Sequence, residues 1–226
     1  NTSDFSRAAL HAGKAPSPGK TNLSALLIIS GSFVIVTDPS EFSLEIKLAY
    51  SRGIFPWFSE GEPILWWSPD PRLVLEPSAF KLRRSLKQAI KKQGFEIRIN
   101  TQFETLIRLC AETREGREGT WITEEMINAY TTLNRQGHAI SFETYRDNEL
   151  VGGLYGVKLG RVLFGESMVS LVPDASKVAL AAICQNANQH QIELIDCQVP
   201  TSHLQSLGAS LIDRVEFIDR ITKLIV

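Results

Sequence analysis

The stretch that most constrains the fold spans residues 149–168 and reads ELVGGLYGVKLGRVLFGESM. It holds two extended, largely apolar runs, at residues 150–157 and 161–167, with Leu159-Gly160 between them. Two such runs joined by a short turn are typical of a β-hairpin. The sequence therefore predicts a long hairpin at the centre of a sheet.

Three glycines and one acid make this hairpin unusual. Gly152, Gly153 and Gly156 lie inside a strand pattern, where glycine marks either a simple bend or a close approach of backbone or ligand. Glu166 follows an apolar run, and a carboxylate there is costly unless it has a partner. We therefore interpret Glu166 as a candidate functional residue.

A second polar pair lies in LIDCQV, residues 194–199. Strand alternation places Asp196 and Gln198 on one face and Cys197 on the other. The carboxylate could hold the amide in one orientation and attract a cationic amine, and the amide oxygen could then accept from the attacking amine. A satisfied buried pair is the alternative. Cys197 lacks a histidine at a spacing that marks a base, so the pattern does not favour a nucleophilic thiol.

Composition excludes several classes of protein. The 226 residues are 43% hydrophobic with a net charge of −1, which fits one domain, or one plus a small one, with no global field for nucleic acid. Three scattered cysteines predict neither a disulfide framework nor a zinc site and fit a cytosolic protein. We find no metal-ligand spacing, no apolar run long enough for a membrane span and no secretion signal.

The N-terminal third divides into three parts. We expect an irregular arm at 1–22, short strands at 25–29 and 33–37, and a helix over 41–51. Residues 53–72, GIFPWFSEGEPILWWSPDPR, hold three of the four tryptophans and four of the ten prolines. Prolines fix φ and stop regular structure, so this stretch predicts a rigid loop between two units. Its alternative role is a clasp that buries Trp66 and Trp67.

Basic residues crowd the predicted helix 78–93, which Ser78 begins and Gly94 ends. Its cations are Lys81, Arg83, Arg84, Lys87, Lys91 and Lys92, with no acid among them. The face is either simply solvated or a contact for a phosphate backbone.

The remaining periodicities predict a mixed, mostly antiparallel sheet with helices on its faces, behind a small N-terminal α/β unit. The class is α+β. The expected strands are 95–100, 138–145 and 192–199 beside the hairpin, and the expected helices are 101–110 with a Thr101–Glu104 capping box, 123–133, 175–189 and 201–207, with a charged loop at 112–119.

Several blocks together resemble the leucyl/phenylalanyl-tRNA–protein transferase family. They are GIFPWFSEGEPILWWSPDPR (53–72), GTWIT (119–123), ELVGGLYGV (149–157), FGESM (164–168), DASK (174–177), LIDCQV (194–199) and HLQSLGA (203–209). The likeness runs from about residue 49 to 217. The family's usual glycine-rich stretch before the first helix is replaced here by residues 30–43.

This resemblance implies a fold and an activity. The family moves Leu or Phe from Leu-tRNA or Phe-tRNA onto proteins with an N-terminal Arg or Lys, which marks them for N-degron degradation. It implies a small domain at 1–70, a GCN5-related acyltransferase-like domain at 71–226, no cofactor, and a cytoplasmic, monomeric protein.

The resemblance also implies site residues. The polar centre matches Glu166, Asp196 and Gln198. The pocket for the aminoacyl side chain matches Leu154, Leu163, Ser167, Met168 and Ile195. Trp57 and Trp121 match the tryptophans that hold the terminal adenosine of the tRNA, and Tyr130 matches a tyrosine near them. The segment that contacts the tRNA acceptor stem matches the basic residues Arg83, Arg84, Lys87 and Lys91.

Two rival functions remain at this point. An acetyl-CoA-dependent acetyltransferase of the same fold would need a glycine-rich turn for the pyrophosphate, and residues 170–177 contain no glycine. A non-catalytic binding protein for tRNA or N-termini would need Trp57 and the basic helix, but it has no use for Asp196 and Gln198.

Overall fold

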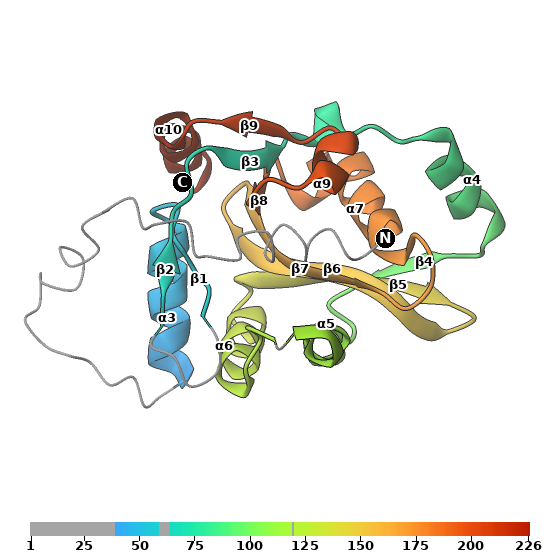
Figure 1. Cartoon of the computed structure of the whole chain (residues 1–226), viewed down its shortest axis with the longest axis horizontal. Helices are drawn as coiled ribbons and strands as arrows, with labels where there is room; N and C mark the ends of the chain where they lie inside the picture. The colour runs from blue at the N-terminus through green and yellow to red at the C-terminus, as the bar shows by residue number, and fades with distance from the viewer. Residues whose placement is uncertain (1–38, 59–63, 119) are drawn as a thin grey trace, which may run out of the picture.

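A computed structural model describes residues 39–58, 64–118 and 120–226, so the predicted arm and the strands at 25–29 and 33–37 lie outside the described residues. A seven-stranded sheet in the order β4-β5-β6-β7-β8-β3-β9 forms the centre, and β7 with β8 is its one parallel pair among the described strands (Figure 1). This arrangement confirms the α+β class with a mostly antiparallel sheet.

The described strands are β1 Phe55–Pro56, β2 Trp66–Trp67, β3 Arg72–Leu75, β4 Glu96–Ile99, β5 Ala139–Arg146, β6 Glu149–Leu159, β7 Val162–Ser170, β8 Leu194–Gln198 and β9 Ser210–Ile212. The described helices are α3 Pro39–Tyr50, the 3-10 turn Pro77–Ala79, α4 Arg84–Lys92, α5 Phe103–Glu118, α6 Glu124–Arg135, α7 Ala175–Gln185, α8 Ala187–His190, α9 Ser202–Ser206 and α10 Arg214–Leu224.

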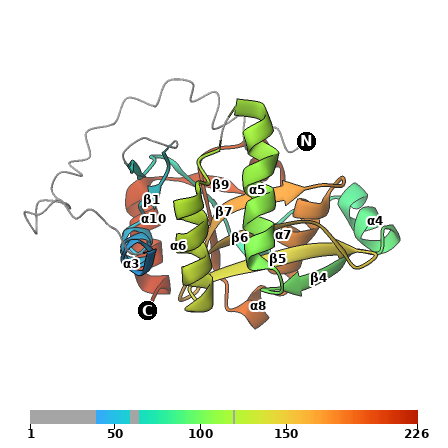
Figure 2. The ribbon, with the colours of Figure 1, turned by 90° about the horizontal axis from the view of Figure 1, so that it is seen from below.

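Helices cover both faces of the sheet. α5 and α6 lie on one face, and α7 and α9 on the other (Figures 1 and 2). One apolar cluster joins α3, α5, α6 and α10 to the sheet, and a second joins α7 and α9 to it. α3 therefore shares a core with the larger unit, while the division at residue 70 stays a prediction. No described helix has both the length and the apolar character needed to cross a membrane.

The central hairpin forms as predicted. Asp147 and Asn148 make the turn before it with positive φ angles of 53° and 63°. The structure explains why residue 156 is a glycine. The β6–β7 register shifts between Tyr155 and Gly156, and a Cβ at Gly156 would lie 2.2 Å from the Phe164 carbonyl oxygen. This glycine thus permits a bulge with close backbone approach.

Two predicted helix boundaries are wrong. The basic helix does not begin at Ser78: a separate 3-10 turn ends at Ala79, Phe80 is extended, and α4 begins only at Arg84, after Arg83. The extended backbone of Phe80 separates the 3-10 turn from α4. The predicted helix 175–189 likewise divides at Asn186 into α7 and α8.

The start of α5 differs from the capping box. The backbone N–H groups of Thr101 and Gln102 donate to the Glu143 carboxylate at 3.1 and 2.9 Å, and the Thr101 hydroxyl also donates to it. A buried acid on β5 thus takes the place of the local cap, since helix N-termini favour negative charge. α5 also continues to Glu118, through the predicted loop at 112–119.

Candidate active site

The two polar segments meet where β7 and β8 separate. The parallel pairing ends at Phe164↔Asp196, and Glu166 and Gln198 each lie two residues beyond it on their own strands. We call residues 164–166 of β7 with 196–198 of β8 the strand fork. Gln198 has a left-handed φ of 63°, which turns the chain at the end of β8. Its side-chain Nε2 donates to Glu166 Oε1 at 3.2 Å, across the fork.

Two tyrosines complete the surroundings of Glu166. The Tyr130 hydroxyl of α6 donates to Glu166 Oε2 at 2.8 Å, and the Tyr50 and Tyr130 hydroxyl oxygens lie 3.0 Å apart. Glu166 itself is 2% exposed, and both tyrosines are fully buried. Tyr130, which the resemblance places near the site, therefore contacts the polar centre directly. Sequence reasoning alone missed Tyr50, which lies on the apolar side of the predicted first helix.

Burial changes the acidity of Glu166. The pKa of Glu166 rises from 4.5 to about 7, and loss of solvation is the largest cause of this rise. Hydrogen bonds from Tyr50 and Tyr130 lower the pKa, the nearby Asp196 charge raises it, and Arg72 lowers it. The carboxyl group can therefore take up and release a proton near neutral pH. This is the property that a general acid or base needs.

Asp196 has a different partner from the one predicted. Its two oxygens accept from Arg72, Nε to Oδ1 at 2.8 Å and Nη2 to Oδ2 at 2.6 Å, and both side chains are 0% exposed. Oδ1 also accepts from the backbone N–H of Gln198 at 2.9 Å. The expected contact with the Gln198 side chain is therefore wrong. Because Arg72 already balances the charge of Asp196, this carboxylate is poorly suited to attract a second cation such as an ammonium group.

Arg72 is a second site residue, besides Tyr50, that the sequence does not single out. A signal for it exists, because an arginine that opens the apolar strand RLVL needs an acid nearby to be buried.

An apolar cavity adjoins the strand fork. All five residues predicted for the side-chain pocket line it, namely Leu154, Leu163, Ser167, Met168 and Ile195. Leu180 of α7 and Leu204 of α9, which the sequence did not single out, also line it. The cavity measures about 40 Å³, close to the roughly 30 Å³ that one water occupies in the liquid. A Leu or Phe side chain thus requires lining groups such as the flexible, partly exposed Met168 to move.

The candidate adenosine residues lie at the edge of the larger apolar cluster. Trp57 and Trp121 are both partly exposed and pack against the apolar cluster that contains Tyr130. Trp67 supports Trp57, because its Nε1 donates to the Trp57 carbonyl oxygen at 2.8 Å and the ring centroids lie 5.9 Å apart. Trp66 and Trp67 are half-buried in a hairpin, so the predicted clasp buries them only in part.

α4 presents its cations to solvent. Arg84, Lys87 and Lys91 are exposed, while Leu86 and Ala89 are buried on the opposite side. In the described part of the chain, no ion pair joins these three cations to an acid. Arg83 precedes the helix, and its Nη2 donates to the Ser206 carbonyl oxygen at 3.2 Å.

Cys197 also lines the apolar cavity. Burial raises the pKa of the Cys197 thiol well above its usual range, so it stays protonated and is a poor nucleophile.

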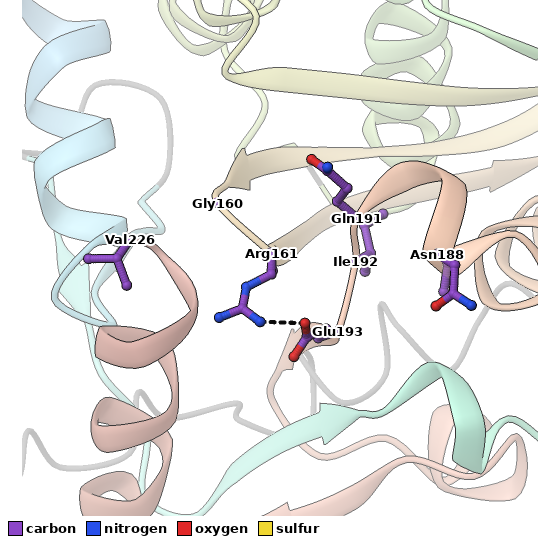
Figure 3. Close-up of a pocket in the computed structure, with 8 residues that line it drawn as sticks. Gly160, Arg161, Asn188, Gln191, Ile192, Glu193 and Val226 are labelled. Atoms are coloured by element: carbon purple, nitrogen blue, oxygen red, sulfur yellow. Dashed lines mark hydrogen bonds and ion pairs between the residues drawn. The ribbon is translucent and has the colours of Figure 1, made fainter.

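A second cleft of about 380 Å³ lies by the β6–β7 turn, where Arg161 pairs with Glu193 beside Asn188 and Gln191 (Figure 3). None of the predicted site residues lines that cleft.

The raised pKa of Glu166 predicts a pH-dependent stability. Because the folded-state pKa lies above the ordinary value of 4.5, the protonated group stabilises the fold fully below that value, and the contribution is lost as pH rises through about 7. It amounts to about 3 kcal/mol at most. Glu166→Gln lacks the titration, so urea melts at about pH 5 and about pH 8 should show the wild type losing more stability than the variant. Equal losses in both proteins would contradict the assignment.

Comparison with known proteins identifies the family. A family model described as "Leucyl/phenylalanyl-tRNA protein transferase" matches residues 74–222, and one described as its N-terminal domain matches residues 43–70. An aminoglycoside acetyltransferase from an uncultured soil metagenomic sample is similar in structure, with 18% identity, a TM-score of 0.39, and coverage of 58% of this chain and 89% of that one. A likeness that low carries no argument.

Close relatives bear the same name as the family model. The chain is 54% identical over 176 residues to the leucyl/phenylalanyl-tRNA–protein transferase of Hydrogenovibrio crunogenus, covering 77% of this chain and 68% of the relative. For that of Legionella pneumophila the identity is 47% over 203 residues, covering 90% and 87%. The chain belongs to the leucyl/phenylalanyl-tRNA–protein transferase family.

Proposed function

We propose that this enzyme transfers Leu or Phe from aminoacyl-tRNA to the α-amino group of proteins that begin with Arg or Lys, and so marks them for N-degron degradation. Family membership supports the reaction class. The chemistry rests on one observation: the Glu166 carboxyl group has a pKa of about 7 and lies beside an apolar cavity and the Gln198 amide. The enzyme works as a monomer in the cytoplasm and uses no cofactor.

The reaction needs a free amine more than it needs a protein nucleophile. A protein N-terminus has a pKa of about 7.7–8.0, so most of it is ammonium at neutral pH. The Glu166 carboxylate takes one ammonium proton, and the amine nitrogen then attacks the ester carbonyl carbon. A C–N bond forms, the C–O bond to the ribose breaks, and the ribose oxygen receives the second proton that the nitrogen loses as it becomes an amide. Because the ester is already activated, orientation of the amine by Gln198 supplies much of the remaining catalysis.

Each predicted group has a proposed task in this scheme. The cavity at the strand fork receives the Leu or Phe side chain, Trp57 and Trp121 stack on the terminal adenosine, and the exposed cations of α4 meet the acceptor stem. The partly exposed indoles and the solvent-exposed cations are the observations that support the last two assignments. Base–aromatic stacking of this kind is worth about 1–3 kcal/mol per base.

The start of α7 argues against an acetyl-CoA donor. Acetyl-CoA enzymes bind the pyrophosphate with free backbone N–H groups at a helix start. Here the Ser176 N–H donates to Ser170 Oγ at 2.9 Å, and the Ala175 N–H donates to the Val172 carbonyl oxygen at 3.3 Å. Two of the N–H groups needed for a pyrophosphate are already occupied.

Donor choice tests the proposal. Labelled Phe-tRNA, Leu-tRNA and acetyl-CoA would each be offered with a peptide that begins with Arg, and with a matched peptide that begins with acetylated Arg. We expect transfer from both charged tRNAs to the free peptide only. Acetyl transfer, or equal labelling of the blocked peptide, would overturn the proposal.

The basic helix gives a second prediction. Replacing Arg84, Lys87 and Lys91 with Ala should weaken tRNA binding and lower the slope of log affinity against log salt by roughly one unit for each lost phosphate contact. The matched control is Lys223→Ala on α10, which pairs with Asp219 in the same helix. Fluorescence anisotropy with labelled tRNA over a salt series measures both. An unchanged slope would leave α4 as a solvated face.

A further inference from the structure

We propose that Arg72 is a positioning residue for the transfer reaction: it fixes the Asp196 carboxylate, which holds the backbone at Gln198 so that the Gln198 amide faces Glu166. This inference rests on the proposed function.

The hydrogen bonding of Arg72 is directed at Asp196. Its Nε and Nη2 both bind the Asp196 carboxylate, at 2.8 and 2.6 Å, and Nη1 is buried without a hydrogen-bond partner among the described residues. The guanidinium carbon lies 4.8 Å from the Phe55 ring centroid and 4.6 Å from that of Phe217. These two rings hold the guanidinium plane without competing for its donors, so its bidentate contact fixes where the carboxylate points.

Asp196 passes this constraint to Gln198. Its Oδ1 accepts from Arg72 and also from the Gln198 backbone N–H at 2.9 Å. Gln198 has a φ of 63°, a conformation that L-residues rarely adopt, so it needs an external hold. With the backbone held there, the side chain donates to Glu166 at 3.2 Å. A continuous series of contacts thus runs from Arg72 to the proposed proton acceptor.

Arg72 also sets the charge near Glu166. The titratable and charged groups that act on Glu166 are Tyr50 of α3, Tyr130 of α6, Asp196 of β8 and Arg72 of β3. Asp196 raises the pKa of Glu166, and Arg72 lowers it. Removing the guanidinium charge therefore moves the activity profile toward higher pH, whereas a residue that only supported the fold would not move it.

Three variants separate positioning from folding. Arg72→Lys keeps the charge but loses the fork-shaped contact, and Arg72→Met loses both. In Arg72→Met/Asp196→Leu an apolar pair replaces the buried ion pair, a change that proteins often tolerate. Ile221→Ala, in the fully buried core of α10, is the matched control for simple destabilisation. All four are compared with the wild type by thermal melts and by single-turnover transfer at saturating Phe-tRNA.

We expect Arg72→Lys to slow transfer about tenfold and Arg72→Met about a hundredfold, with the KM for Phe-tRNA within about twofold of the wild type. Arg72→Met should also shift the pH profile upward. The double variant should regain thermal stability while turnover stays low, and Ile221→Ala should lose stability with near-normal turnover. Full turnover in Arg72→Met, or its return together with stability in the double variant, would overturn the proposal.

A direct titration distinguishes failure of the role of Arg72 from failure of the proposed function. Carboxyl-labelled glutamate in the full chain reports the Glu166 pKa by NMR, with Glu166→Gln as the assignment control. The Glu166 pKa should be higher in Arg72→Met than in Arg72→Lys, whether or not the wild type transfers Phe. Identical titration curves would refute the role of Arg72, while absence of transfer by the wild type would refute only the proposed function.

Discussion

Replacing Glu166 by Gln should slow aminoacyl transfer roughly 10²- to 10⁴-fold, the usual contribution of a general acid or base. The variant keeps the size of the side chain and can still bond to Tyr130 and Gln198, so donor binding should barely change. Single-turnover transfer at saturating Phe-tRNA measures the loss. Glu149→Gln, at the exposed start of β6, is the matched control and should behave like the wild type.

The pH dependence sharpens this prediction. In the wild type, the pKa of Glu166 near 7 means that the carboxylate fraction, and with it the transfer rate, rises as pH increases through neutrality. The Gln variant should keep only the ionisation of the peptide amine. A variant that transfers at the wild-type rate, or keeps the ionisation near 7, would show that another group takes the proton.

Asp196→Asn should destabilise the fold by about 3–5 kcal/mol, because it leaves the fully buried Arg72 charge without its partner. For a chain of this size each kcal/mol lowers the melting temperature by about 2–4 °C, so a fall on the order of 10 °C is expected. Transfer by the folded fraction should also fall, since the hold on Gln198 is weakened. Donor affinity should stay near the wild-type value.

Asp219→Asn is the control for this prediction. Asp219 forms an ion pair with Lys223 on the surface of α10, with side chains 58% and 70% exposed. Exposed pairs contribute little, so its melting temperature should hardly move. Equal, small effects of the two substitutions would mean that the buried ion pair does not support the strand fork as described.

Local patterns predicted the parts of this molecule that depend on near neighbours. The hairpin over residues 149–168 followed from strand and turn signals, and the strand that holds Asp196 and Gln198 followed from the apolar run at 192–199. The pocket residues came from the family resemblance, and the structure gathers all five around one cavity. Their roles in the reaction stay predictions.

Contacts between distant parts of the chain could not be predicted in this way. Arg72 and Asp196 are 124 residues apart, and nothing in either segment names the other. Glu143 takes over the N-terminus of α5 from a strand 41 residues away, which is why the local capping box at Thr101 was misleading. Tyr50 and Tyr130 meet only because α3 packs on α6. In each case tertiary packing, rather than local propensity, chose the partner.

The mass of the product tests the central claim most directly. An Arg-starting peptide would be incubated with Phe-tRNA and either the wild type or Glu166→Gln, and the peptide would then be fragmented in a mass spectrometer. We predict that the wild type adds one phenylalanyl residue at the N-terminal amine and that Glu166→Gln yields little product in the same time. An unmodified peptide with the wild type, or phenylalanine on a side chain, would contradict the account.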